Sequence, residues 1–422
     1  MTEQHTAAVA TPSLWRRRGY LVYLASQAMA QTGFQVSVVA IPLTAVLVLD
    51  ASPVQLGLLV AAERVPFLIF ALMAGVLVDR WSRRTLLIVT SLLRAPLVLS
   101  VPLAAALGWM SVSQLYLVAF LLGTLTVLSD VASLSIMPSL VPREQLTDAN
   151  AKLEAARSGS EVVGPGLGGA LVKLITAPYA LIADAVLFLA SGAMLLALPK
   201  DDVQQETTET GTRSAWQEIK AGIAFVWQSA VLRWNAVVAA ITNLFVYAFL
   251  AIQYLYIVDD LQLGAAFVGV ILSLGGVGGV LGSFAAGWIS NRVGIGGGFL
   301  IGSAVMAVGV VLVGIAPAGM GPGLVLAGGG YLLFVCGIPI FNVAAVTIRQ
   351  AVTPAALLGR TNATMRFLIW GTIPLGSLLG GVAAEATGSR TVVLLSGVAL
   401  LIPTVLLALS PIRGLRVAEN QT

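Results

Sequence analysis

The sequence predicts an all-α membrane protein of twelve transmembrane helices, arranged as two pseudo-symmetric bundles of six. The chain of 422 residues is 58% hydrophobic and only 10% charged, with a mean hydropathy of +0.95, which excludes a soluble globular protein. Its apolar runs reach the length of about 20 residues that a membrane-spanning helix needs. In addition, the second half of the chain repeats residue spacings of the first.

Apolar runs separated by polar connections predict the individual spans. Six belong to the first half, at residues 20–48, 54–78, 85–107, 113–138, 156–176 and 178–198. Six belong to the second half, at residues 234–258, 265–289, 296–316, 323–348, 363–384 and 390–410. The predicted domains are an N-terminal tail (1–18), a first bundle (19–198), a linker (199–233), a second bundle (234–410) and a C-terminal tail (411–422). Within the linker, apolar residues recur at helical spacing from Trp216 to Trp227, which predicts a helix along the membrane surface.

Charged residues are divided unequally between the connections. With the N-terminus inside, most lysines and arginines fall in the inner connections. The outer connections hold mainly Asp50, Asp259, Asp260, Glu385 and Arg390. The positive-inside rule therefore predicts a multi-pass protein of the plasma or inner membrane, with both termini cytoplasmic. The same distribution explains the sequence pI of 9.4 without a nucleic-acid partner.

A constant shift of 212 residues superposes matching residues of the two halves. The pairs are Gly57 and Gly269, Gly75 and Gly287, Arg80 and Arg292, Pro142 and Pro354, Leu146 and Leu358, Asn150 and Asn362, Gly164 and Gly376, and Gly168-Gly169 with Gly380-Gly381. One shift that holds from the second span to the fifth predicts two homologous bundles. In transporters built this way, the substrate site lies near the midplane between the repeats.

Two motifs and two longer passages resemble the major facilitator superfamily. Residues 75–84, GVLVDRWSRR, resemble the loop motif between helices 2 and 3, with Ser82 where glycine is common. Residues 164–169, GPGLGG, resemble the antiporter motif of helix 5, although Ser160 and Ala151 replace two usual glycines. The motif positions are Gly164, Pro165, Gly168 and Gly169. Residues 140–151 and 216–234 are similar to the branch of enterobactin exporters and macrolide-efflux proteins, which implies the major facilitator fold and export.

The resemblance implies a gating latch that joins the inner ends of the bundles when the transporter opens outward. Its residues would be Gly75, Asp79, Arg80, Arg83, Arg84 and Asp130. Asp130, near the inner end of the fourth span, would pair with one of these arginines. The alternative is that the arginines are ordinary loop charges that obey the positive-inside rule.

Three charged residues lie near the predicted midplane: Glu63, Arg64 and Arg94. Each costs about 2.5–3.5 kcal/mol on insertion scales unless it is paired or hydrated. One interpretation is a structural Glu63–Arg94 ion pair. The other is proton coupling by Glu63, tuned by Arg94. Because neighbouring residues do not share a helix face, Glu63 and Arg64 are not expected to point into the same narrow pocket.

Other charges in the first half have structural interpretations. Arg157 lies one helical turn from Glu154 and one from Glu161, which predicts an ion-pair ladder along the fifth span. Asp184 is expected near the outer rim, paired with Lys173.

Polar residues spaced by four mark one face of the first span. They are Gln27, Gln31 and Gln35, and the 212-residue shift relates the last two to Asn243 and Tyr247. Because amides facing lipid are costly, these side chains are expected to line a polar, largely uncharged cavity. Asn342 and Trp370 are further candidates. The alternative is hydrogen bonding between helices without ligand contact.

The remaining features limit the chemistry. With Cys336 as the single cysteine and His5 as the single histidine, no disulfide, metal site or cofactor is expected. The glycine-rich residues 275–287 lie inside a span, so they predict close packing against the fifth helix rather than a nucleotide site.

The sequence therefore predicts a monomeric secondary transporter that exports a small amphipathic compound, of drug, antibiotic or siderophore type, in exchange for protons. One alternative is an importer or exchanger of the same fold that uses no protons. A second, from another class, is a membrane enzyme for lipid-linked substrates, which the lack of clustered acidic residues disfavours.

Overall fold

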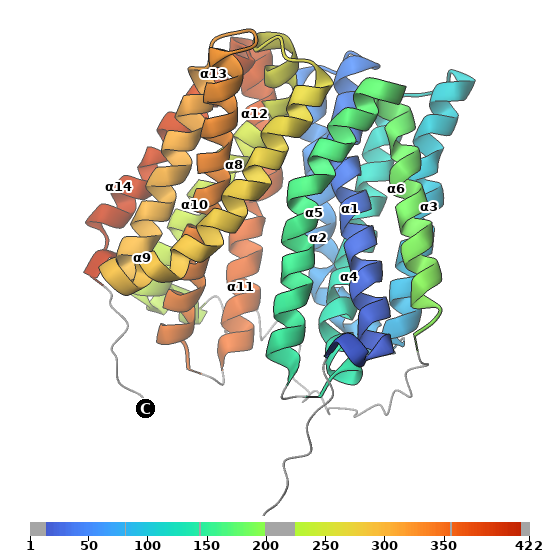
Figure 1. Ribbon diagram of the computed structural model, residues 1–422. Coiled ribbons are helices and arrows are strands. Elements are labelled where there is room, and N and C mark those ends of the chain that lie inside the picture. The colour runs from blue at the N-terminus through green and yellow to red at the C-terminus, as the bar shows by residue number, and fades with distance from the viewer. Residues whose placement is uncertain (1–13, 81, 143–144, 199–223, 355–356, 415–422) are drawn as a thin grey trace, which may run out of the picture.

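The computed structural model describes residues 14–80, 82–142, 145–198, 224–354 and 357–414, nearly all of them helical (Figure 1). Within these ranges the side chains of residues 71–80, 134–135, 147, 358–360 and 363 lie outside the description. The first half contains η1 (Leu14–Arg16), α1 (Arg18–Leu47), α2 (Pro53–Arg80), α3 (Arg83–Leu107), α4 (Val112–Leu140), α5 (Leu146–Ile175) and α6 (Ala177–Leu195). The second contains α8 (Ala230–Leu255), η3 (Tyr256–Asp260), α9 (Ala265–Gly314), α10 (Pro322–Val352), α11 (Leu358–Trp370), α12 (Thr372–Thr387), α13 (Ser389–Ala399), α14 (Leu401–Leu409) and η5 (Pro411–Gly414).

These helices make twelve crossings in the described part of the chain. Ten helical stretches are long and apolar enough to span a membrane. One of them, α9, contains two crossings, because the backbone reverses at Gly294 with φ 82° and ψ 168°, a conformation that favours glycine. The more polar α5 supplies the remaining crossing, whereas α11–α12 and α13–α14 are each one span interrupted by a break. The predicted fold class is confirmed.

The two halves are related by the same 212-residue shift that the sequence shows. α2 begins at Pro53 and α9 at Ala265, while residues 146–175 of α5 correspond to residues 358–387 of α11 and α12. The contacts correspond as well. A Cβ atom built on Gly57 would lie 2.5 Å from the carbonyl oxygen of Ser377, and one on Gly269 would lie 2.5 Å from that of Pro165. The repeat is therefore structural as well as sequential.

Contact between the halves is concentrated at the upper end of the molecule as drawn in Figure 1, where α1 ends and α2 begins. There α5 packs against α9, and α12 packs against α2. At the lower end, where α1 and α5 begin, the helices of the two halves lie apart (Figure 1). The protein is thus closed between its halves at the upper end.

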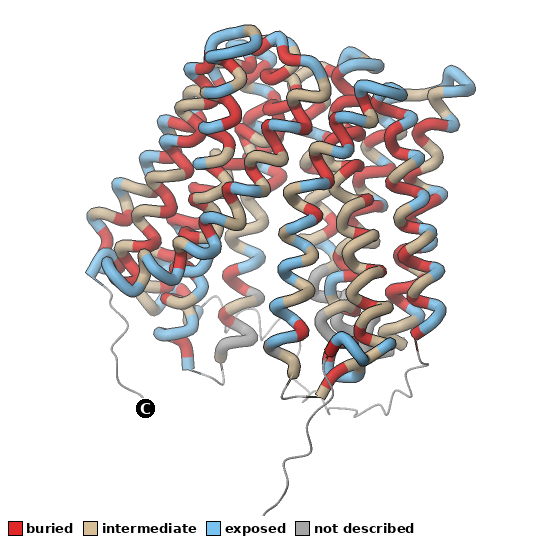
Figure 2. Tube along the Cα trace, viewed as in Figure 1, coloured by how far each residue is buried: buried red, intermediate tan, exposed pale blue. Residues whose placement is uncertain are grey.

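Large apolar side chains remain exposed on the outer helices. Examples are Leu174, Phe284, Val325 and Leu409, each more than 70% exposed. Figure 2 shows exposed residues along the length of the outer helices, between the two ends of the molecule. Such an apolar exterior suits contact with lipid tails, and the chain is a multi-pass membrane protein.

Two boundaries differ from the prediction. The fifth helix begins at Leu146 rather than at residue 156, because polar residues extend it below the apolar run, and Lys152 pairs with Asp148 one turn earlier. In the linker, residues 224–228 form a short helix whose Val226 is buried beside Leu232 and Met365. The rest of the predicted surface helix lies outside the described residues.

Candidate functional site

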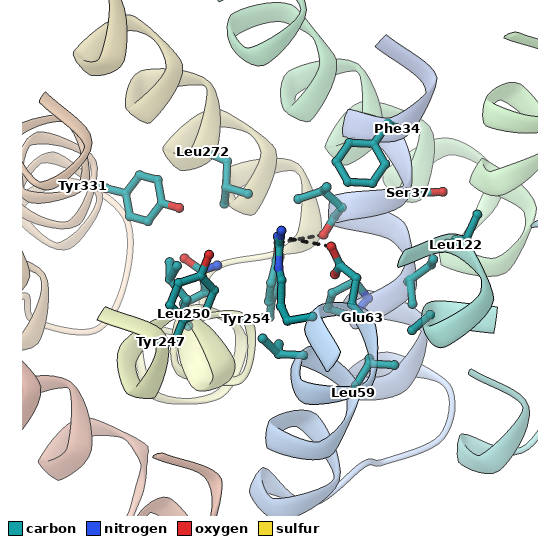
Figure 3. A pocket seen from close by; sticks show the side chains of 17 residues that line it. Phe34, Ser37, Leu59, Glu63, Leu122, Tyr247, Leu250, Tyr254, Leu272 and Tyr331 are labelled. Atoms are coloured by element: carbon teal, nitrogen blue, oxygen red, sulfur yellow. Dashed lines mark hydrogen bonds and ion pairs between the residues drawn. The ribbon is translucent and has the colours of Figure 1, made fainter. Parts of the chain in front are cut away.

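A cavity of about 190 Å³ lies between the two halves (Figure 3). Helices α1, α2 and α4 form one wall and α8, α9 and α10 the other. From the first half, Phe34, Ser37, Val38, Glu63 and Arg64 are among the lining residues. The second half supplies Tyr247, Leu250, Gln253, Tyr254, Leu272 and Tyr331. The site is therefore mostly apolar and aromatic, with one charged pair.

That charged pair consists of Glu63 and Arg64, whose Oε1 and Nη2 atoms lie 3.2 Å apart. The expectation that these neighbours do not share a pocket was wrong. An arginine side chain is long enough to bring its guanidinium around the helix, so both groups reach the cavity. Each side chain remains about one-third exposed, so water screens the pair and its net contribution to stability is small.

Arg64 also contacts the opposite half. Its guanidinium carbon lies 5.9 Å from the ring centroid of Tyr247, within the range of a cation–π contact. Tyr247 therefore lines the cavity, and its part in binding a substrate stays a prediction. The arrangement places an ion pair and an aromatic face side by side in one cavity, which can accept both the apolar and the polar part of an amphipathic molecule.

Tyr254 joins the two halves directly. Its hydroxyl donates a hydrogen bond of 2.7 Å to the carbonyl oxygen of Val38 on α1. Replacing Tyr254 by phenylalanine should reduce the free energy that favours closure of the upper end by about 1 kcal/mol. The ratio of molecules open at that end to molecules closed there should then rise roughly fivefold. Spin-label distances between the two halves at the upper end should lengthen in a larger fraction of molecules.

Tyr256→Phe is the matched control for this prediction. The Tyr256 hydroxyl donates only within its own half, to the carbonyl oxygens of Val313 at 2.9 Å and Gly314 at 3.2 Å. Its loss should leave the distances between the halves unchanged. Equal distance distributions in Tyr254→Phe and the unmodified protein would contradict the role given to Tyr254.

The predicted glutamine stripe on α1 does not line this cavity. Gln27 donates to Ser133 Oγ at 2.8 Å and therefore bonds within its own half. Gln35 packs against α5, because a Cβ built on Gly164 would lie 2.4 Å from the Cβ of Gln35. Gln31 is half-buried and is not among the lining residues. For Gln27, hydrogen bonding between helices is therefore the interpretation that the geometry supports.

The three other cavity candidates lie outside the lining as well. Asn243 donates to the Ile369 carbonyl at 3.1 Å, within the second half. Asn342 is exposed on α10. Trp370 meets Phe67 of α2 with ring centroids 5.5 Å apart, so it contributes to contact between the halves rather than to this cavity.

Arg94 is buried, with 6% of its surface exposed, but it does not pair with Glu63. Its Nη2 donates to Thr126 Oγ1 at 3.0 Å, and its guanidinium lies 5.3 Å from the ring centroid of Phe188. The predicted Glu63–Arg94 pair is therefore wrong. The sequence places both residues at a similar height, whereas helix rotation turns Arg94 toward α4 and α6.

The latch region is only partly described, because the side chains of Gly75, Asp79 and Arg80 lie outside the description. Arg84 Nη2 donates to the Leu196 carbonyl at 2.7 Å, at the end of α6 in the same half. Among the carboxylates whose side chains are described, none lies within ion-pair distance of Arg83 or Arg84.

Asp130 of α4 is exposed and interacts electrostatically with several arginines of both halves. They are Arg94, Arg157, Arg366 and Arg64. Of the predicted latch partners, Arg83 and Arg84 make no ion pair with it here. The latch assignment stays a prediction.

The antiporter-like motif forms the close contacts of α5. A Cβ on Gly168 would lie 3.2 Å from the Val39 side chain of α1, and one on Gly169 would lie 2.8 Å from Gly269 Cα of α9. The glycine-rich stretch of α9 reaches α5 through Gly276, where a Cβ would lie 2.5 Å from the Glu161 carbonyl oxygen. Gly278 instead faces the Leu332 carbonyl of α10, so this stretch packs on two helices rather than on α5 alone.

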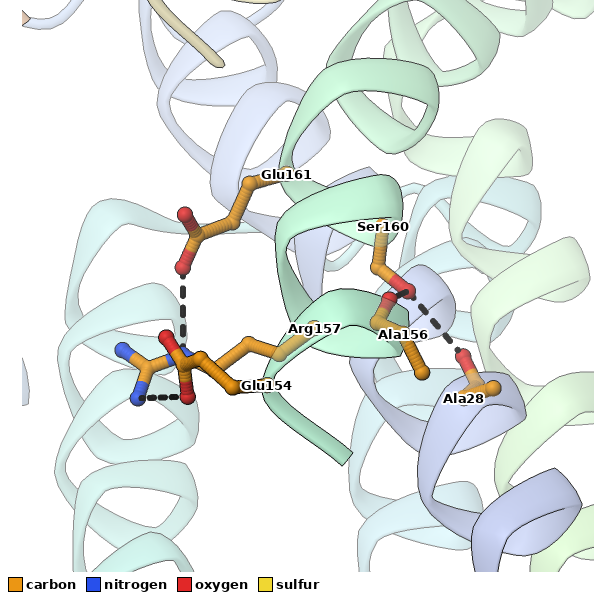
Figure 4. Close-up of polar contacts among 6 residues, drawn as sticks. All are labelled: Ala28, Glu154, Ala156, Arg157, Ser160 and Glu161. Atoms are coloured by element: carbon orange, nitrogen blue, oxygen red, sulfur yellow. Dashed lines mark hydrogen bonds and ion pairs between the residues drawn. The ribbon is translucent and has the colours of Figure 1, made fainter. Parts of the chain in front are cut away.

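The predicted ladder on α5 is present (Figure 4). Arg157 Nε lies 3.2 Å from Glu161 Oε1, and its Nη1 lies 4.0 Å from Glu154 Oε2. On the other side of the helix, Ser160 Oγ donates to the carbonyl oxygens of Ala156 and Ala28 (Figure 4).

Of the cavity residues on α1 and α8, only Tyr247 was among the candidates from the sequence, although the spacing of the others carries a signal. Tyr247, Leu250 and Tyr254 are spaced as i, i+3 and i+7, which places them on one face of α8. Phe34, Val38 and Ile41 are spaced as i, i+4 and i+7, which likewise places them on one face of α1. A search restricted to amides finds the neighbouring face of α1 instead.

Comparison with known proteins identifies the fold and the family. Residues 23–373 match the model of the Major Facilitator Superfamily. Among solved structures, the nucleoside transporter NupG has a TM-score of 0.73 at 13% identity, covering 93% of this chain and 98% of that one. A bacterial homologue of the iron transporter ferroportin in the inward-facing state has a TM-score of 0.70 at 18% identity, covering 94% and 99%.

Relatives with assigned names also match along most of their length. The multidrug efflux pump Tap of Mycolicibacterium fortuitum is 28% identical over 419 residues, covering 96% of this chain and 99% of the relative. Tap of Mycobacterium tuberculosis (strain ATCC 25618 / H37Rv) is 27% identical, covering 91% and 90%. An uncharacterized transporter, y4rN of Sinorhizobium fredii, is 29% identical, covering 82% and 83%. Together with the duplicated six-helix bundles, these matches show that the chain belongs to the Major Facilitator Superfamily of transporters.

Proposed function

We propose that this transporter exports small amphipathic compounds, of drug, antibiotic or siderophore type, in exchange for protons. The observation that carries the proposal is the cavity between the halves, where the Glu63–Arg64 pair lies beside Tyr247. Aromatic walls suit the apolar part of such a cargo, and the ion pair suits its polar or charged part. Likeness to proteins named multidrug efflux pumps supports export.

The lower end, which carries the basic connections, is assigned to the cytoplasm of the plasma or inner membrane by the positive-inside rule. On this assignment the conformation is inward-facing, because the halves meet at the opposite, outer end. Arg84 then binds its own half because the latch is open. Proton entry supplies about 2.3 kcal/mol per charge per 100 mV, which supports a concentration ratio on the order of 50. The transporter works as a monomer.

Glu63 is the carboxylate that the cavity exposes, so we assign it to proton exchange during cargo binding. Glu63→Gln should abolish export of cargo against its concentration gradient, while exchange of cargo between the two sides of the membrane persists. The measurement is accumulation of ethidium and of a catecholate siderophore in cells with and without the protein, repeated after the proton gradient is collapsed.

Glu154→Gln is the control, because Glu154 is exposed in the ladder of α5 and does not line the cavity. It should transport as the unmodified protein does. Equal accumulation in cells with and without the protein would reject export of these compounds, and efflux that survives collapse of the gradient would reject proton coupling. Uphill transport by Glu63→Gln would reject the role of Glu63 alone.

A further inference from the structure

Asp184 of α6 is fully buried behind the wall of the cavity, with 0% of its surface exposed. Its expected partner Lys173 is exposed and makes no ion pair with it in the described structure, so the predicted rim contact is wrong. About two turns of helix separate Asp184 from the start of α6 at Ala177, and α1 covers it from the cavity side.

The carboxyl group of Asp184 has one hydrogen bond. Ser37 Oγ donates to its Oδ2, while its Oδ1 has no partner among the described residues. Gly33 of α1 presses against it, since a Cβ at that position would lie 2.5 Å from Oδ1. No described lysine or arginine nitrogen lies within 4.0 Å of either oxygen.

A buried carboxylate needs a cation or several hydrogen bonds, and here it has neither. The neutral acid fits the same space better, because a protonated carboxyl presents a hydroxyl group that does not require a counter-ion. In the conformation seen here, the geometry therefore favours a proton on Asp184.

Ser37 connects this group to the cavity, because it belongs both to the cavity wall and to the partners of Asp184. Figure 3 shows Ser37 at the edge of the cavity, with its hydroxyl turned away from the centre. A small movement of α1 or of this side chain would open a route for a proton between Asp184 and water in the cavity.

Arg94 of α3 is the charged group that faces Asp184. It interacts with Asp184 electrostatically, beyond ion-pair distance, and its Nε has no partner among the described residues. From α1 the facing groups are the Ser37 hydroxyl and Gly33, and α5 presents no charged side chain to Asp184 in the described structure. An ionised Asp184 would thus be stabilised by Arg94, which gives the group a second state.

We propose that Asp184 is a second proton-binding site of the transport cycle, loaded in this conformation and emptied into the cavity past Ser37. The O–H bond of the acid breaks, the proton passes to water, and the carboxylate that remains turns to Arg94. The proposal rests on the proton exchange proposed above and adds a carboxyl outside the cavity to it.

Infrared spectroscopy of the purified protein tests the proton directly and needs no cargo. The unmodified protein should show the carbonyl band of a protonated carboxylic acid at neutral pH. Asp184→Asn should lack this band, and Ser37→Ala should shift it, because the acid loses its hydrogen-bond partner. An identical band in all three proteins, or no such band in the unmodified protein, overturns the proposal. If Asp184→Asn does not fold, the Ser37→Ala comparison decides alone.

Proteoliposomes test the role in the cycle. Asp184→Asn should lose uphill ethidium transport driven by a pH gradient by tenfold or more, yet keep ethidium exchange at equilibrium, since it imitates the protonated acid. Full gradient-driven transport by Asp184→Asn overturns the assignment while the proposed function stands. If the unmodified protein shows no gradient-driven transport, proton exchange itself fails and the inference falls with it.

Discussion

A Gly269→Leu variant is expected to lose the closed upper end of the molecule and, with it, most of its transport. A Cβ at this position would lie 2.5 Å from the Pro165 carbonyl oxygen and 2.9 Å from Gly169 Cα. Both contacts are backbone atoms on the opposite half, so no rotamer change relieves them. The halves must separate at this end, which disfavours the conformation described here.

The size of the effect follows from the cost of overpacking. Forcing extra methylene groups into a close contact costs about 1–3 kcal/mol, so the ratio of the two conformations should shift by roughly 5- to 150-fold. Access to the cavity from the upper end should rise accordingly. A cysteine introduced at Leu59, which lines the cavity, reports this access through a membrane-impermeant maleimide in a Cys336→Ser background.

One control variant lies on the same helix, and an equivalent variant lies in the other half. Among the residues that the structure describes, nothing lies within 4 Å of a Cβ built on Gly287, so Gly287→Leu should label and transport as the unmodified protein does. Gly57→Leu should reproduce the effect of Gly269→Leu, because a Cβ at Gly57 would lie 2.5 Å from the Ser377 carbonyl oxygen. Unchanged labelling in Gly269→Leu would show that the glycine contact does not hold the upper end closed.

The same glycines explain why so much of the fold is predictable from the sequence. A backbone in lipid must satisfy its own hydrogen bonds, so each apolar run of sufficient length becomes a helix. Close contact between two helices needs residues without side chains, so Gly57 and Gly269 recur at one fixed spacing. The number of helices can therefore be predicted from the apolar runs, and the relation between the halves from the spacing of the glycines.

Which residues meet across the bundle depends on helix rotation, which hydropathy does not encode. Glu63 and Arg94 occur at similar depth, yet Glu63 lies beside Arg64 in the cavity and Arg94 faces Thr126. Asp184 likewise lies in the interior rather than at the rim, because α1 covers it through Gly33. Depth was predictable for Glu63 and Arg94, whereas the partners of all three groups were not.

Polar side chains serve two purposes, hydrogen bonding between helices and lining the cavity, which the sequence does not distinguish. The amides of Gln27 and Asn243 are consumed by hydrogen bonds between helices, whereas Tyr254 both lines the cavity and joins the halves. A buried polar group must find a partner wherever it lies, so polarity alone does not separate structural from cargo-binding positions.

Arg94→Met is expected to separate stability from transport. The Arg94 guanidinium is buried, makes a hydrogen bond with Thr126 and leaves its Nε without a partner among the described residues. Replacing an incompletely satisfied buried charge by an apolar side chain of similar volume is often neutral or stabilising. We therefore expect the thermal unfolding temperature of Arg94→Met to stay the same or rise.

Transport by Arg94→Met should nevertheless fall by tenfold or more. Without the guanidinium, an ionised Asp184 has no cation facing it, so the cycle loses a charge-assisted contact of about 1.5–3 kcal/mol. Gradient-driven ethidium uptake into inverted vesicles measures this loss, beside a thermal melt of the same preparation. Arg94→Lys keeps the charge without the planar fork and should recover part of the transport. A melt lowered by Arg94→Met, with transport reduced only in proportion to the folded protein, would instead make Arg94 a structural residue of the α3, α4 and α6 interface.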